Sequence, residues 1–157
     1  PNDLIVERRA GDAGGWDRRK LGGILTEGSV TDGVIRHVVV GIGINLDPAV
    51  HPPEVATLAT SVRAETGRPV EVFPLFAACR AALARERERL FAGDLAGMIR
   101  RWRERAPSAV GARVKVTADG RRLTGVTAGL ADDGTLAVVA DVTGERLHVV
   151  AGDVEWI

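Results

Sequence analysis

The chain has 157 residues, of which 45% are hydrophobic and 27% are charged, enough for one domain or for a partial domain followed by a small module. Its 21 basic and 21 acidic residues balance, which excludes the general electrostatic attraction of a strongly basic protein to nucleic acid or membrane surfaces. One cysteine excludes an internal disulfide framework, and the longest apolar run, VVVGIGI at 38–44, is too short to cross a bilayer. With no signal-peptide pattern either, these properties predict a cytoplasmic globular protein.

The first residues read as the start of a strand, with a turn-like Pro-Asn-Asp followed by an apolar run at 4–6. Because the chain opens on a proline and on a strand already in progress, we expect it to lack an upstream part of its natural polypeptide. Residues 8–18 (RRAGDAGGWDR) have the glycine and aspartate content of an exposed hairpin loop, and 21–26 is predicted to be the return strand.

A long apolar strand is predicted over 34–46 (VIRHVVVGIGINL), after a tight turn at Asp32-Gly33. A β-branched run this apolar is typical of a strand buried on both faces, although a buried helix has the same composition. Three prolines between 47 and 53 break the pattern, and one short helix is predicted between 54 and 66.

Two longer helices are predicted next, over 70–92 and 95–106. Apolar residues recur at helical spacing in the first, and Cys79 on that stripe is expected to pack in a core. Asp94 is expected to cap the second helix.

After Pro107 the pattern changes to four or five short β-rich runs separated by turns that contain Asp and Gly. The runs are 112–118, 122–130, 135–141 and 146–150. This spacing predicts a small barrel or sandwich, with a domain boundary near Pro107-Ser108.

The spacing of the histidines and glycines argues against a zinc site and against a dinucleotide-binding site. The histidines, His37, His51 and His148, stand in a strand, a proline loop and the β module, so no zinc pattern is present. Gly41-Ile42-Gly43 resembles the start of a dinucleotide fingerprint, but Leu46 stands where the third glycine belongs and prolines follow instead of a helix.

What remains is a set of polar residues at the ends of three apolar strands: Asn2, Asp3, Lys20 and Asn45. Four glycines lie beside them, namely Gly22, Gly23, Gly41 and Gly43. Glycine weakens a strand unless a bulge or a close backbone approach requires it, so this group fits a flat ligand lying against bare main chain. The alternative is chance placement in a chain with 19 glycines, and on these residues alone both readings stay open.

Four segments, in order, resemble the successive motifs of the biotin–protein ligases: PNDL at 1–4, RKLGGIL at 19–25, VVVGIGINL at 38–46 and ATS at 59–61. The end of the chain, with GARVKV, DDGTLAVV and AGDVEW, is similar to the SH3-like domain of that family. The resemblance implies an α+β fold. Residues 1–107 would be the second half of a ligase catalytic domain, a mixed sheet with packed helices, and residues 108–157 a small SH3-like β-barrel. The family's first half, with the loop that closes over biotin, has no counterpart here.

The resemblance also implies a reaction: ATP-dependent, Mg²⁺-assisted activation of biotin to biotinyl-5′-AMP, followed by transfer to a lysine of a biotin carboxyl carrier protein. Lys20 matches the family lysine that contacts biotin and the ATP phosphate, and we expect it to act as a buried cation between the two anions. An ammonium suits this role because it is compact and rotates freely. Asp3 matches the aspartate that orients or deprotonates the incoming lysine amine, although capping of the turn at the strand start is a competing role.

The remaining matches concern binding. Asn2 and Asn45 match positions near the phosphate and its Mg²⁺, since amide groups suit hard cations and phosphate oxygens. The glycines match the strands that line the biotin pocket, where a missing Cβ leaves room for the ring: Gly22, Gly23, Gly41 and Gly43.

Other functions remain open at this point. A lipoate- or octanoyl-transferring relative would share the fold, although RKLGGIL and the terminal β module favour biotin. A biotin-sensing repressor would need an upstream helix-turn-helix, and only then would DNA be a partner. A truncated, inactive remnant is a third alternative, and a homodimer is compatible with each. We expect these 157 residues by themselves not to form biotinyl-AMP, because the closing loop that excludes water is missing.

Overall fold

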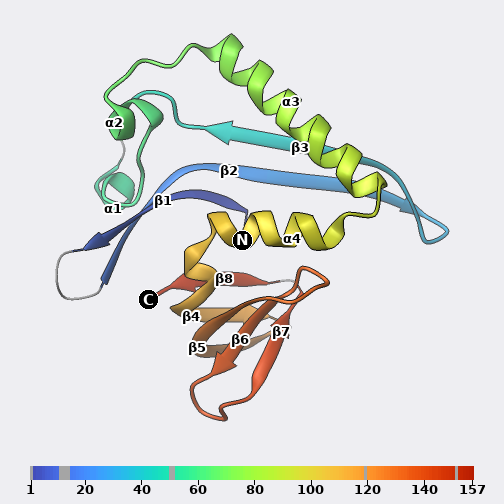
Figure 1. Ribbon diagram of the computed structural model, residues 1–157. Helices are drawn as coiled ribbons and strands as arrows, with labels where there is room; N and C mark the ends of the chain where they lie inside the picture. The colour runs from blue at the N-terminus through green and yellow to red at the C-terminus, as the bar shows by residue number, and fades with distance from the viewer. Residues whose placement is uncertain (1, 11–14, 50–51, 119, 151) are drawn as a thin grey trace. The chain divides into compact units, whose positions relative to one another are not determined.

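The computed structural model describes residues 2–10, 15–49, 52–118, 120–150 and 152–157. The chain forms two compact units, Asn2–Leu75 and Phe76–Ile157. Figure 1 shows a three-stranded sheet with two short helices in the first unit, and helices followed by a five-stranded sheet in the second. This mixture of helices and sheets confirms the predicted α+β class. A domain boundary near Pro107 stays a prediction.

The first sheet consists of β1 (Asp3–Ala10), β2 (Gly15–Thr31) and β3 (Val34–Ile44), in the order β1-β2-β3. Both ladders are antiparallel, and the parallel pairing of the predicted mixed sheet is limited to an isolated bridge between Lys20 and Ala59. The ladders are antiparallel because short connections join consecutive strands, and only antiparallel neighbours can be joined that way.

Strand β2 is longer than the sequence predicted. Residues 15–18, assigned to an exposed loop, continue the strand, and Arg18 donates to the Glu7 carboxylate of β1 at 2.8 Å. Both side chains are largely buried. The high glycine and charge content was therefore misleading, since a cross-strand ion pair accommodates the charges. Residues 11–14 of the predicted loop lie outside the described residues.

Strand β3 is an edge strand, paired only with β2 among the described residues. Its apolar side chains are exposed in this chain, from Val34 at 54% and Ile35 at 66% to Ile42 at 43%. The prediction of burial on both faces is therefore wrong here. The strand has the composition of a buried one, but a three-stranded sheet that ends at β3 does not cover it.

The helix predicted between 54 and 66 is two short helices, α1 (Pro53–Ala56) and α2 (Val62–Thr66). Ser61 interrupts the pattern, because its backbone is extended and its hydroxyl accepts the Ala64 N–H as the N-cap of α2. Gly67, with φ of 69°, ends α2 in the left-handed conformation that glycine favours. The intervening residues 58–60 lie beside β2.

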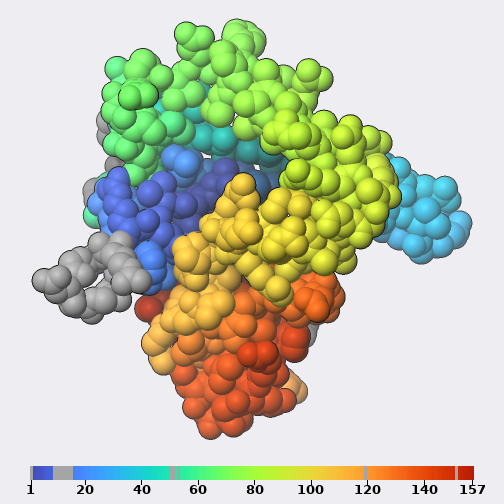
Figure 2. Space-filling view, in the orientation of Figure 1, coloured from blue at the N-terminus to red at the C-terminus, as the bar shows by residue number. Residues whose placement is uncertain are grey.

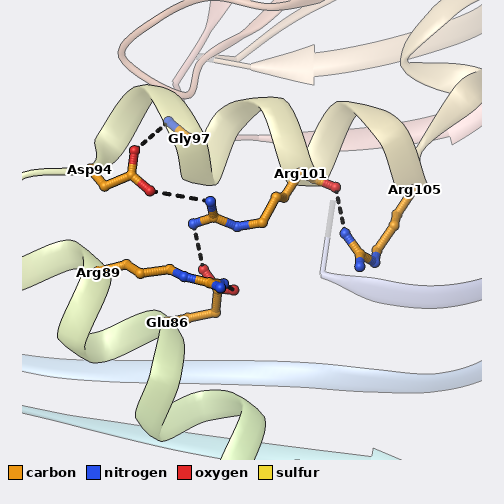
Figure 3. A network of polar contacts seen from close by, with 6 residues as sticks. All are labelled: Glu86, Arg89, Asp94, Gly97, Arg101 and Arg105. Atoms are coloured by element: carbon orange, nitrogen blue, oxygen red, sulfur yellow. Dashed lines mark hydrogen bonds and ion pairs between the residues drawn. The ribbon is translucent and has the colours of Figure 1, made fainter.

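Helices α3 (Val72–Phe91) and α4 (Leu95–Arg105) confirm the two predicted helices. Residues 72–75 of α3 belong to the first unit, and the rest of α3 and all of α4 belong to the second. Asp94 caps α4 as predicted, accepting the Gly97 N–H at 3.0 Å. Arg101 joins the two helices by donating to Glu86 of α3 at 2.8 Å and to Asp94 at 3.2 Å (Figure 3). Hydrogen bonds from Arg101 lower the pKa of both carboxyl groups. Cys79 is only partly buried, so its predicted place in a core is wrong.

A 3-10 turn (Pro107–Ala109) leads into β4 (Val110–Ala118), β5 (Arg121–Leu130), β6 (Leu136–Ala140), β7 (Arg146–Val149) and β8 (Asp153–Trp156). Their order is β7-β6-β5-β4-β8, and no pairing joins β7 to β8 in the described residues. The predicted barrel is therefore not closed. Val114, Val116 and Val138 are completely buried and form its core. In the space-filling view these strands, orange to red, form a dense body (Figure 2).

Candidate functional site

An open cavity of about 450 Å³ lies on the first sheet, and six of the eight predicted site residues line it. We call it the glycine cavity, and its lining residues are Asn2, Asp3, Lys20, Gly23, Ile24, Leu25, Gly41, Ile42 and Gly43. The antiparallel register explains the grouping, because Gly23 pairs with both Asp3 of β1 and Gly43 of β3. Residues separated by 40 positions in the sequence therefore meet on one stretch of sheet.

Lys20 and Asp3 form an ion pair at the cavity wall, with 2.7 Å between Lys20 Nζ and Asp3 Oδ1. The two side chains are 54% and 48% exposed. The prediction of a buried cation is therefore not met in this chain, because the cavity is open to solvent. An exposed pair of this kind contributes little to stability, so both groups can exchange partners at low cost.

The three glycines that line the cavity leave real space. A Cβ on Gly23 would lie 3.8 Å from its nearest neighbours, Asp3 Oδ1 and Lys20 Cε, and one on Gly41 would lie 3.8 Å from the Leu25 carbonyl oxygen. For Gly43 the nearest atom would be 4.0 Å away. The floor of the cavity is therefore bare backbone that a flat ligand could approach closely.

Gly22 serves a different purpose. It is buried, it does not line the cavity, and a Cβ there would lie 2.1 Å from the backbone oxygen of Gly43. The missing side chain at Gly22 admits β3, not a ligand. The steric case for a ligand therefore rests on Gly23, Gly41 and Gly43.

Asn45 follows directly after the end of β3 and is not among the residues that line the cavity. Its N–H donates to the Leu21 carbonyl at 2.8 Å, and its Nδ2 donates to the Thr60 carbonyl at 3.0 Å. Asn2 anchors the other side, where its carbonyl accepts the Ile24 N–H at 2.7 Å. The residues that line the glycine cavity thus include an ammonium, a carboxylate and one side-chain amide, and Asn45 follows two residues after the lining Gly43.

The residues that hold this arrangement together were not predicted from the sequence. Thr60 and Ser61 are buried polar residues, with 8% and 2% exposure, and the backbones of Leu58 and Thr60 hydrogen-bond to the backbone of Lys20. The only signal in the sequence was the ATS segment at 59–61, which entered as part of a resemblance without a role for its side chains.

The oxygens available for a cation come from amides and a single carboxylate. No group of three or more His, Cys, Asp or Glu side chains gathers within the described ranges. His37 is on β3 and His148 on β7, where its Nδ1 lies 3.1 Å from the Thr135 hydroxyl, while His51 lies outside the described residues. No described helix is long and apolar enough to cross a membrane.

Comparison with solved structures gives the fold a precedent. The chain is similar to the apo biotin protein ligase of Aquifex aeolicus, with a TM-score of 0.67 and 19% identity over 88% of this chain and 59% of that one. The same ligase in complex with biotin and ATP gives a TM-score of 0.64 and 18% identity, over 88% of this chain and 56% of the ligase. A mutant of it in complex with biotin gives a TM-score of 0.67 and 19% identity. No family model and no curated protein matches the sequence. The chain has a biotin-protein-ligase-like fold and spans little more than half of those ligases.

Proposed function

We propose that the intact protein is a biotin–protein ligase, which joins biotin to ATP and passes the biotinyl group to a lysine of a carboxyl carrier protein. The observation that carries this proposal is the glycine cavity. Three glycines with open space above them stand beside a lysine and an aspartate, on a fold shared with a ligase that was solved with biotin and ATP.

In the first step a biotin carboxylate oxygen attacks the α-phosphorus of ATP, the bond to the β-phosphate oxygen breaks, and pyrophosphate leaves. Two anions must approach each other, so a cation at their junction lowers the barrier. Lys20 is suited to this, since its ammonium lies at the wall of the cavity and its present partner, Asp3, is 2.7 Å away and exposed. The incoming ligand would take over the ammonium, leaving the Asp3 carboxylate free.

In the second step the amine of a carrier lysine attacks the carbonyl carbon of the mixed anhydride and AMP leaves. The amine must lose a proton, and Asp3 is the carboxylate that lines the cavity. Its separation from Lys20 in the loaded site would free it to orient that amine or accept its proton.

ATP in such a reaction carries Mg²⁺, which neutralises phosphate charge when bound. Asn2 lines the cavity, Asn45 stands two residues after the lining Gly43, and amide oxygens are suitable ligands for this hard cation. These two residues would hold the cation together with phosphate oxygens and water.

The experiment compares Lys20→Ala and Lys20→Arg with Lys115→Ala in the intact protein. The chain has only these two lysines, and Lys115 pairs with Glu155 in the other unit, so it is a matched control. Lys20→Ala should slow single-turnover formation of biotinyl-AMP about 10²–10³-fold, the effect of losing one transition-state donor. Lys20→Arg should recover part of the rate, because it keeps the charge but not the shape.

Transfer from preformed biotinyl-AMP is measured separately, so that the two steps are distinguished. A normal adenylation rate for Lys20→Ala would refute the assigned role. An intact protein that activates lipoate or octanoate but not biotin would refute the substrate.

A further inference from the structure

Thr60 connects two of the predicted site residues that come from different strands. Strand β3 leaves the sheet after Ile44, and residues 58–60 take its place beside β2 as a short parallel bridge at Lys20. The Lys20 N–H donates to the Leu58 carbonyl at 2.6 Å, and the Thr60 N–H donates to the Lys20 carbonyl at 2.9 Å. The backbone that carries the ammonium is therefore set by this segment as well as by β1.

The same residue fixes the side chain of Asn45. The Thr60 carbonyl accepts from Asn45 Nδ2 at 3.0 Å. Because a carbonyl can only accept, this bond determines which end of the amide faces Thr60, and a flipped amide would place two acceptors together. Asn45 Oδ1 accepts no hydrogen bond from the described residues, so this oxygen can still bind another group.

Thr60 is itself held by its side chain. Its hydroxyl donates to the Glu65 carboxylate, which also forms an ion pair with Arg8 of β1. Glu65 is on α2, which begins at the Ser61 cap immediately after Thr60. The hydroxyl therefore ties this bridging residue to a helix and, through Arg8, back to the sheet.

We propose that Thr60 is a positioning residue, which holds Lys20 and Asn45 in one frame and makes Asn45 present its oxygen to the site. Thr60 touches no substrate in this assignment and acts through the other two residues. In the loaded enzyme, which rests on the proposed function, the oxygen so presented suits the Mg²⁺ of Mg-ATP rather than a phosphate oxygen.

The first test needs no activity. The chain has two asparagines, Asn2 and Asn45, and no glutamine, so its ¹⁵N spectrum contains only two side-chain amide groups. In wild type the Asn45 amide protons should exchange with solvent more slowly than those of Asn2, whose side chain is exposed. Thr60→Val removes the hydroxyl but keeps the shape, and should speed Asn45 exchange about two- to tenfold, the worth of one weakened hydrogen bond.

Two variants control this measurement. Thr60→Ser keeps the hydroxyl and should restore slow exchange. Thr66→Val makes the same change on α2, where the hydroxyl bonds only to Val62 of its own helix and to the backbone of Arg68, and should leave Asn45 unchanged. If Thr60→Val does not fold, Glu65→Ala removes the acceptor of the Thr60 hydroxyl instead and should speed Asn45 exchange in the same direction.

The second test measures adenylation by the intact protein at varied Mg²⁺. Thr60→Val should lower kcat and raise the Mg²⁺ concentration for half-maximal rate, each about two- to tenfold, while the KM for biotin stays within twofold. An intact wild-type protein without adenylation would refute the proposed function and leave the exchange experiment to decide the role of Thr60. Asn45 exchange that is unchanged in both Thr60→Val and Glu65→Ala would overturn the positioning role.

Discussion

Substitution by alanine distinguishes the glycine that allows close contact between strands, Gly22, from a glycine that leaves open space, Gly41. In Gly22→Ala the new Cβ would lie 2.1 Å from the Gly43 oxygen and 3.1 Å from two further backbone atoms. Ordinary contact begins near 3.4 Å, so β2 and β3 must move apart by about 1.3 Å (3.4 less 2.1). A backbone ladder cannot give way as a flexible side chain can.

The expected cost follows from that displacement. Overpacking of this kind costs about 1–3 kcal/mol, and a weakened Asn45 N–H to Leu21 hydrogen bond adds about 1 kcal/mol. Gly22→Ala should therefore lower the free energy of unfolding by about 2–4 kcal/mol. Gly41→Ala is the matched control, because its Cβ would meet only ordinary contacts and Gly41 does not have a positive φ. It should be neutral or stabilising by up to about 1 kcal/mol.

Urea-induced unfolding followed by tryptophan fluorescence measures the stability of both variants. Calorimetry with biotin on the intact protein measures their affinity for biotin. Gly41→Ala should fold normally but weaken biotin binding about tenfold or more, because the methyl group takes space in the glycine cavity. Equal stability of Gly22→Ala and wild type would refute the close approach of β2 and β3. Unchanged biotin affinity of Gly41→Ala would refute the cavity as the biotin site.

Two further predictions concern the second unit. Thr127→Val should lower the free energy of unfolding by about 2–4 kcal/mol in a urea titration, because the Ala112 N–H and the Ser108 carbonyl would lose the buried hydroxyl that they bond. The control, Thr143→Val in an exposed turn, should change the free energy of unfolding by less than about 0.5 kcal/mol. Arg101→Met should lower Tm at pH 7, and the difference from wild type should shrink as the pH falls below the ordinary pKa values of the two carboxyl groups. The folded pKa values of Glu86 and Asp94 are lowered by Arg101, so their stabilisation is present above the ordinary values of 4.5 and 3.8 and is lost as the pH falls through the folded ones. A Tm difference of the same size at every pH down to acid unfolding would show that packing, not charge, is responsible.

Much of the secondary structure was accessible from local sequence. The 3.6-residue apolar spacing and the capping residue Asp94 predicted α3 and α4 nearly to their ends, because these signals act within one turn of helix. The turns with Asp and Gly likewise separated the strands of the second sheet. Asn2, Asp3, Lys20, Gly23, Gly41 and Gly43 were proposed together from the strand-end pattern and the resemblance, and they do line one cavity.

Which side chains are buried could not be predicted from the local sequence. An apolar run such as 34–42 predicts a strand, but the cover on its two faces comes from residues elsewhere, and here β3 stays exposed. The charged 15–18 segment was misread for the converse reason, since Arg18 finds its partner Glu7 across a strand pair. Whether the five-stranded sheet closes also depends on its edge strands meeting, which no single strand encodes.

The sequence by itself determined which residue types are available: an ammonium, a carboxylate, two amides and a set of glycines at strand ends. The tertiary structure alone decided their roles, because roles depend on distances between residues far apart in the chain. Register assigns Gly22 to contact with β3 and Gly41 to open space, although the two glycines are identical in chemistry. Because β3 leaves the sheet after Ile44, Thr60 can contact both Lys20 and Asn45. Its N–H donates to the Lys20 carbonyl and its carbonyl accepts from the Asn45 side chain, and only the folded backbone brings these groups together.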